Sequence, residues 1–177
     1  MESLAAIYAR HSTPSGVGDK GTLHSYIDVY ERLLAPMRLH AQRILEIGVA
    51  QGHSLRMWRE YFPHAEIIGV DCEPCDVAGC IVIRGDATRR STYLGVGNLD
   101  LVIDDGSHDI EQQVRAFNIL APHLGYHGVY VIEDVQCYEE SGDRLRALPG
   151  YCETHDGRGR TGVVDDVMCV YRPWQST

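Results

Sequence analysis

Acidic side chains follow two of the buried strands that the sequence predicts. Residues 99–109 read LDLVIDDGSHD, and residues 128–136 read GVYVIEDVQ. Neighbouring parallel strands lie roughly 5 Å apart, and their carboxyl ends share one edge of the sheet. We therefore expect four carboxylates to meet at that edge: Asp104, Asp105, Glu133 and Asp134. Such a group is repulsive unless it is protonated or holds a cation, and hard oxygen ligands in this number suit Mg²⁺.

His108 lies three residues after Asp105, where the strand turns into the next predicted helix. Imidazole titrates near neutral pH, so this side chain could remove a proton from a bound hydroxyl. A metal ion beside that hydroxyl would lower its pKa and ease the step. The plainer alternative is a solvated loop histidine, with Ser107 or Asp109 acting only as the N-cap of the following helix. The paired acids favour the catalytic interpretation.

A glycine-rich turn follows the first predicted strand, where the chain reads EIGVAQGHS from Glu46 to Ser54. Gly48 and Gly52, four residues apart, permit a tight turn and close approach of a ligand to the backbone. Asp71 ends the next strand, where a carboxylate can accept hydrogen bonds from both hydroxyls of a ribose. Together these features predict that an adenosine-bearing ligand binds in the crevice beyond the strand ends.

The spacing of this turn excludes two common nucleotide-binding loops. Position 50 is Ala, so the GxGxxG pattern of NAD-binding turns is absent, and no Gly-Lys-Ser/Thr follows as it would in a P-loop. Glu46 suits a ligand with a cationic group better than one with a pyrophosphate. Asp86 lies in a Gly-Asp-Ala sequence after the third predicted strand and could accept a hydrogen bond from an adenine amino group.

Strands and helices alternate along the chain, which favours an α/β fold with a doubly wound, mostly parallel sheet and helices on both faces. Short apolar runs predict strands at 43–49, 66–70, 80–84, 99–103 and 128–132, with a late strand at 166–171. Helical spacing predicts helices at 24–37, 54–61 and 110–124, with shorter helical pieces at 4–8 and 143–148. Residues 157–162, rich in Gly and Arg, are predicted to form a mobile loop.

The bulk composition predicts one globular domain, 1–177, with a helical cap at 1–40 and a core at 41–177. The 25 acidic and 16 basic residues give a net charge of −9, which disfavours a nucleic-acid partner. No stretch resembles a signal peptide or a membrane span, so we expect a cytoplasmic protein. The six cysteines are expected to be free thiols, because a zinc site usually needs a second pair beside Cys72 and Cys75.

The combined motifs resemble those of class I methyltransferases that use S-adenosylmethionine (SAM). Over residues 19–135, the segments DKGT, ERLLAP, ILEIGVAQGHSLRMW, DDGSH and YVIED together resemble the macrolide sugar O-methyltransferases of the mycinamicin and macrocin pathways. The resemblance implies a Rossmann-like class I methyltransferase sheet whose last strand, 166–171, is antiparallel. It also implies transfer of a methyl group from SAM to a hydroxyl of a sugar or another small natural product.

The resemblance assigns roles to particular residues. It implies that Asp105, Glu133 and Asp134 hold Mg²⁺ and that His108 is the general base. It places the SAM contacts on the acids around the glycine turn and on the turn itself: Glu46, Gly48, Gly52, Ser54, Asp71, Asp86 and Asp104. In that family the segment carrying Lys20 and Tyr26 folds over the cofactor and the acceptor, which makes both residues pocket candidates. A helix N-cap at Thr22 with core tyrosines is an equal alternative.

Two departures from the family leave the acceptor open. The chain lacks the N-terminal extension that some members use for oligomerisation and for covering the substrate, and its segment after Asp134 is short. A homo-oligomer is therefore neither required nor excluded. Two other functions stay open: a catechol-type O-methyltransferase that acts on a flat phenol, and a non-catalytic SAM-binding domain that has lost the acceptor site.

Overall fold

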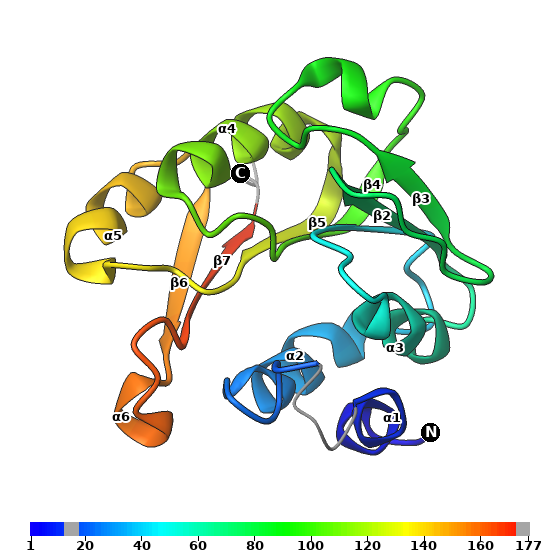
Figure 1. The fold of residues 1–177 in the computed structure, drawn as a ribbon, viewed down its shortest axis with the longest axis horizontal. Coiled ribbons are helices and arrows are strands. Elements are labelled where there is room, and N and C mark those ends of the chain that lie inside the picture. The colour runs from blue at the N-terminus through cyan, green and yellow to red at the C-terminus, as the bar shows by residue number, and fades with distance from the viewer. Residues whose placement is uncertain (13–17, 173–177) are drawn as a thin grey trace.

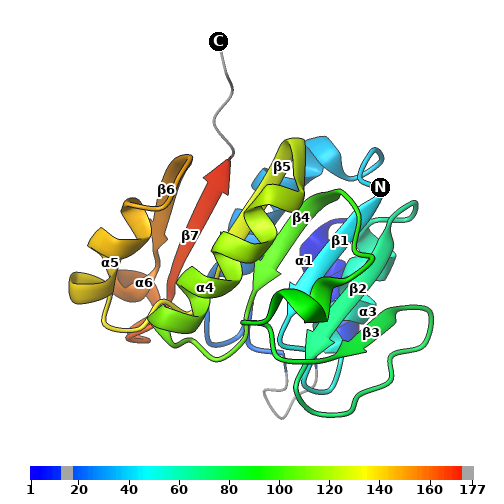
Figure 2. The ribbon, with the colours of Figure 1, turned by 90° about the horizontal axis from the view of Figure 1, so that it is seen from above.

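The computed structural model describes residues 1–12 and 18–172. Seven strands form one sheet in the order β3-β2-β1-β4-β5-β7-β6 (Figure 2). They are β1 (Arg43–Ile47), β2 (Glu66–Asp71), β3 (Ile81–Arg84), β4 (Leu99–Asp104), β5 (Leu124–Ile132), β6 (Tyr151–Asp156) and β7 (Val167–Arg172). The pairs from β3 to β5 are parallel, whereas β7 runs antiparallel to both β5 and β6. The predicted α/β class with an antiparallel last strand is confirmed.

The strand order reverses at the centre of the sheet. β1 pairs with β2 on one side and with β4 on the other. In an open α/β sheet, such a reversal leaves a crevice beyond the carboxyl ends of the strands. The glycine turn after β1 and the acids after β4 and β5 all lie at this edge, so the topology gathers the residues that the sequence singled out.

Helices cover both faces of the sheet (Figure 1). The helices α1 (Leu4–His11), α2 (Tyr26–Leu34) and α3 (His53–Tyr61) pack on one face, and α4 (Ile110–Leu120) and α5 (Tyr138–Arg146) pack on the other. Short turns complete the fold: η1 (Ala35–Met37), η2 (Arg90–Tyr93), η3 (Ala121–His123) and α6 (Arg158–Thr161). The segment predicted as a helical cap shares its core with α3, because the rings of Tyr30 and Trp58 meet edge to face at 5.1 Å.

Alternation along the central strands builds the two cores. On β4, Leu101 and Ile103 face the core under α1, α2 and α3, whereas Val102 faces the core under α4 and α5. Successive side chains of a strand point to opposite faces, so a strand covered on both sides must be apolar at nearly every position. This requirement explains why the central strands read as continuous apolar runs.

The structure differs from the sequence-based prediction mainly after β5. The polar edge strand β6 lies at Tyr151–Asp156, where no strand was predicted, and α5 begins at Tyr138 rather than at 143. The predicted loop at 157–162 contains the helical turn α6, and Arg158 there pairs with Asp156 at 2.7 Å and Glu139 at 2.6 Å. The sequence of β6, YCETHD, has no apolar run to reveal it, unlike that of the other edge strand, β3, which reads IVIR.

The described part of the chain contains no helix that combines the length and the apolar character needed to cross a bilayer. The six cysteines are free thiols, as expected. Within the described ranges none of them joins a cluster of side chains that could hold a metal ion. The metal chemistry of the fold therefore belongs to its carboxylates and histidines.

Candidate active site

The glycine turn packs directly against the end of β4. Gly48 has φ +86°, and a Cβ at this position would lie 2.0 Å from the backbone oxygen of Asp105. The amide of Asp105 in turn donates to the carbonyl of Ile47 at 3.0 Å. Only glycine permits both this left-handed conformation and this close approach. The turn therefore brings the cofactor motif and the acidic motif into contact.

Asp71 holds the same turn from the other side. One carboxylate oxygen accepts from the amides of Val49 at 2.8 Å and Ala50 at 3.1 Å, and the other accepts from the amide of Glu73 at 2.9 Å. Although partial burial raises the pKa of Asp71, these backbone N–H donors lower it by more, so the net pKa is below the usual value. The side chain is thus a fixed anion at the mouth of the crevice.

Two adjoining cavities of about 470 and 720 Å³ occupy the crevice, and Gly48, Asp71 and Gly106 line both. Ser54 lines the first cavity, and Asp86 lines the second. The other three residues predicted to contact SAM line neither cavity: Glu46, Gly52 and Asp104. Gly52 shapes the turn, since its φ is +75° and a Cβ there would lie 2.3 Å from a methyl carbon of Val77.

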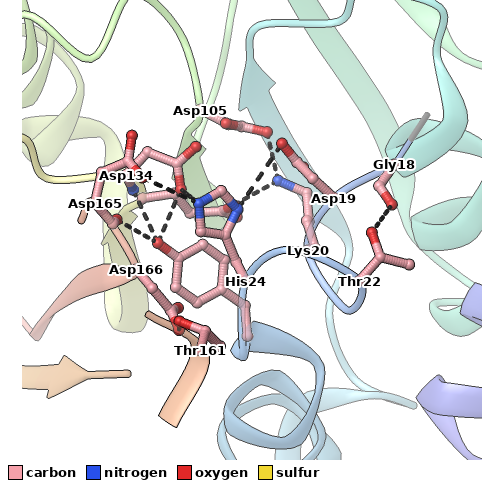
Figure 3. Close-up of polar contacts among 12 residues, drawn as sticks. Gly18, Asp19, Lys20, Thr22, His24, Asp105, Asp134, Thr161, Asp165 and Asp166 are labelled. Atoms are coloured by element: carbon pink, nitrogen blue, oxygen red, sulfur yellow. Dashed lines mark hydrogen bonds and ion pairs between the residues drawn. The ribbon is translucent and has the colours of Figure 1, made fainter. Parts of the chain in front are cut away.

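Lys20 occupies the middle of the acidic cluster. Its ammonium nitrogen lies 2.5 Å from Asp105 Oδ2, a contact that Figure 3 shows. The same nitrogen lies 2.7 Å from Glu133 Oε2 and 3.4 Å from Glu46 Oε1. The residue is only 3% exposed. Burial alone would lower the pKa of Lys20, but the three carboxylates hold it well above its usual value. A permanent cation therefore neutralises the acids that follow β4 and β5.

Asp134 is fixed by the helix α2 on the opposite side of the cluster. The Tyr26 hydroxyl donates to Asp134 Oδ1 at 2.8 Å. His24, two residues before α2, places its Nε2 3.6 Å from the same oxygen (Figure 3). Burial raises the pKa of Asp134 to about 6, and it raises the pKa of its buried neighbour Glu133 well above the usual value. Glu133 also accepts a hydrogen bond from the hydroxyl of Tyr30.

His108 lines the first cavity and faces Asp134. Its Nδ1 lies 3.8 Å from Asp134 Oδ2 and has no hydrogen-bond partner among the described residues, although this atom is buried. His108 and Asp134 both have left-handed backbone conformations, with φ +56° and +50°. Strain of this kind persists where the surrounding structure imposes it, as it does at functional sites.

The side chains fit a divalent cation. Asp105, His108 and Asp134 each present one ligand atom, and these atoms lie within 4.8 Å of one another. Asp105 and Asp134 of this group offer the hard carboxylate oxygens that a divalent cation such as Mg²⁺ prefers. Of the predicted metal ligands, Asp105 and Asp134 thus face the same space, whereas the oxygens of Glu133 contact Lys20 and Tyr30.

Sequence reasoning missed two side chains of this cluster, His24 and Tyr30. Tyr30 lies four residues after Tyr26 on the buried face of α2, which is the spacing of a helix face that points inward. A stronger signal was available for Lys20, which is the only lysine in a chain whose other basic residues are all arginines. Such a lone lysine could have been tested as a site residue, because its compact ammonium differs in shape from the planar guanidinium of arginine.

The chain is similar in sequence to several O-methyltransferases. The chain is 38% identical over 151 residues to the 8-demethyl-8-alpha-L-rhamnosyl tetracenomycin-C 2'-O-methyltransferase of Streptomyces olivaceus, a match that covers 77% of this chain and 38% of that protein. It is 36% identical over 164 residues to the mycinamicin VI 2''-O-methyltransferase of Micromonospora griseorubida, covering 84% and 40% of the two chains. Both proteins are named as O-methyltransferases, and this chain is similar to part of each.

A solved methyltransferase structure is also similar to this chain. The MycE methyltransferase of the mycinamycin biosynthetic pathway, solved with Mg and SAH, superposes with a TM-score of 0.77 at 26% identity, covering 97% of this chain and 54% of that one. No family model matches the chain. The chain spans between 33% and 42% of the length of the curated relatives it matches.

Proposed function

We propose that this chain binds SAM in the two adjoining cavities and transfers its methyl group to a hydroxyl of a sugar on a polyketide-like natural product. The observation that carries the proposal is that residues of the glycine turn and of the acidic motif line one cavity. Asp105 and His108 line the same cavity as Gly48 and Asp71, so a cofactor held by the turn would face the acids and the histidine. The named activities of the relatives, which methylate sugar hydroxyls, support the acceptor class.

The turn and its surrounding acids would hold SAM, which supplies an electrophilic methyl group when bound. Asp71 remains able to accept from ribose hydroxyls because a carboxylate has about four acceptor positions and the backbone uses three. Asp86 would accept from the adenine amino group in the second cavity. Ser54 would contact the part of SAM that lies in the first cavity. Glu46, Gly52 and Asp104 line neither cavity, so they would support the residues that do.

The carboxylates of Asp105, Glu133 and Asp134 would hold Mg²⁺, which when bound lowers the pKa of a coordinated hydroxyl. The MycE complexes with Mg support this assignment. His108 would accept the proton of the acceptor hydroxyl, and Asp134 Oδ2, 3.8 Å from Nδ1, would stabilise the resulting imidazolium. The hydroxyl oxygen, once relieved of its proton, is the nucleophile for the methyl group.

Titration calorimetry and a methyl-transfer assay test this function together. We expect SAH to bind with and without Mg²⁺, and 8-demethyl-8-alpha-L-rhamnosyl tetracenomycin C to be methylated in a reaction that EDTA suppresses. Methylation of a catechol but of no glycoside would indicate the phenol-directed alternative. Tight SAH binding without methylation of either acceptor would indicate a non-catalytic SAM-binding domain.

A further inference from the structure

Lys20 occupies oxygens that the proposed metal ion also needs. Its ammonium lies 2.5 Å from Asp105 Oδ2 and 2.7 Å from Glu133 Oε2, and these two residues are two of the three proposed ligands. The second oxygen of Glu133 accepts from the Tyr30 hydroxyl, so both of its oxygens have partners. In this arrangement a Mg²⁺ ion bound by Glu133 would have to share an oxygen with the Lys20 ammonium or with the Tyr30 hydroxyl.

The ammonium and a divalent cation cannot share these two carboxylates at low cost. Mg²⁺ binds carboxylate oxygens at about 2.1 Å, which would bring it within a few ångström of the Lys20 nitrogen. Lys20 is only 3% exposed, so water screens that repulsion poorly. The geometry therefore describes two cations competing for Asp105 and Glu133, not a lysine and a metal ion that occupy the site together.

Glu46 offers a second place for the ammonium. Its Oε1 lies 3.4 Å from the Lys20 nitrogen, and the side chain is fully buried. Among the described residues, neither Glu46 oxygen has a hydrogen-bond partner. Buried carboxylate oxygens without donors are costly. A short movement of Lys20 toward Glu46 would satisfy this carboxylate and release the other two.

We propose that Lys20 is an exchangeable counter-cation of the metal site: its ammonium neutralises Asp105 and Glu133 until a divalent cation binds, and it then pairs with Glu46. This inference rests on the metal site of the proposed function. Because Gly18, Asp19 and Lys20 line the first cavity, the exchange links metal loading to the wall of the cofactor site.

Mn²⁺ titrations of the wild-type chain and Lys20→Met measure the competition directly. Removing the ammonium should tighten Mn²⁺ binding by about tenfold or more, and it should lower the Tm of the metal-free protein. Arg160→Met is the matched control, because it removes one positive charge from an arginine whose side chain is 62% exposed, and its Mn²⁺ affinity should stay unchanged. Unchanged or weaker Mn²⁺ binding by Lys20→Met would overturn the exchange.

Glu46→Gln tests whether Glu46 pairs with the Lys20 ammonium once the metal ion is bound. It should weaken Mn²⁺ binding several-fold in the wild-type background and have little effect in the Lys20→Met background, because Glu46 acts through the lysine. Equal weakening in both backgrounds would show that Glu46 acts on the metal independently of Lys20, and would overturn its role as the receiving partner.

The single lysine also permits a test without substitution, which does not depend on whether Lys20→Met folds. A sample labelled with ζ-¹⁵N-lysine has one side-chain ammonium signal, and saturating Mg²⁺ should shift it as the partners change. A signal that Mg²⁺ leaves in place, while calorimetry records metal binding, would overturn the exchange. If neither protein binds Mn²⁺, the metal site and the exchange both fail, whereas SAH binding separately tests the cofactor site.

Discussion

The Tyr26 hydroxyl fixes both the side chain and the backbone of Asp134. It donates to Asp134 Oδ1 at 2.8 Å and accepts from the Asp134 amide at 3.2 Å. Asp134 needs this support because its φ is +50°, a conformation that costs free energy for a residue with a Cβ. A helix from the first fifth of the chain thereby positions an acid that follows β5.

Tyr26→Phe should therefore loosen Asp134 without disturbing the cofactor turn. We expect Mn²⁺ affinity and kcat to fall about tenfold, which corresponds to the loss of one buried hydrogen bond to a charged group, while SAH binding stays unchanged. Calorimetry and the methyl-transfer assay measure these quantities. Tyr126→Phe, at an exposed tyrosine, is the matched control. Equal losses of SAH and Mn²⁺ binding would indicate general unfolding instead.

His108→Asn should lower kcat by about 10² to 10⁴, the usual contribution of a general base. The amide keeps a polar side chain at a position with φ +56°, a conformation that asparagine tolerates, so the fold should persist. SAH binding should be retained. His127→Asn, at an exposed histidine outside both cavities, should retain full activity. Full activity in the His108 variant would refute its assignment as the base.

A comparison of Gly48→Ala with Gly95→Ala separates the cost of a steric clash from the cost of a left-handed backbone conformation. The two glycines have nearly equal φ values, +86° and +84°, but an added Cβ meets the Asp105 oxygen at 2.0 Å in the first case and nothing within 4 Å in the second. Gly95→Ala should cost about 1 kcal/mol of unfolding free energy. Gly48→Ala should cost more than about 3 kcal/mol and abolish SAH binding. Urea unfolding and calorimetry with SAH measure both effects, and similar costs would contradict the packing argument.

Asp71→Ala should weaken SAH binding by at least about tenfold, because the variant loses both the proposed ribose contact and the anchor of Val49 and Ala50. Glu73→Ala removes an exposed carboxylate two residues away and should bind SAH like the wild type. Calorimetry measures both affinities. An unchanged SAH affinity in Asp71→Ala would argue against the ribose contact.

Asp104 should make the metal-free protein less stable as the pH rises. Burial raises the pKa of this carboxyl from 3.8 to about 7 in the folded protein. Between these values the folded state keeps a proton that the unfolded state has lost, so the contribution of Asp104 to stability declines from pH 4 to 7 and is lost above that range. Asp104→Asn should remove this decline.

The measurement is the Tm in EDTA from pH 5 to 8. The wild-type Tm should fall by a few degrees relative to Asp104→Asn over this range. Asp100→Asn serves as a control, because this carboxylate lies on the same strand but at a less buried position. Parallel curves for the wild type and Asp104→Asn would show that Asp104 is ionised throughout in the folded protein.

Local sequence was sufficient for most of the fold and for half of the candidate site. The apolar runs of β1, β2, β4 and β5 are dictated by burial on both faces, and the glycines and acids stand at their carboxyl ends. Parallel pairing then brings Gly48, Asp71 and Asp105 together regardless of loop detail. The edge strand β6 escaped prediction because its sequence, YCETHD, has no apolar run, whereas the other edge strand, β3, has one.

Only the tertiary structure decided that the Lys20 ammonium and the hydroxyls of Tyr26 and Tyr30 contact the acids that follow β4 and β5. Lys20 contacts residues 85 and 113 positions further along the chain, and Tyr26 contacts one 108 positions away. No spacing rule relates residues so far apart, since their meeting depends on how α2 packs across the strand ends. The sequence by itself predicted an adenosine site beside an acidic cluster. The packing of α2 and of the turn before it determined that a buried lysine pairs with Asp105 and Glu133, because unpaired carboxylates could not otherwise be buried together.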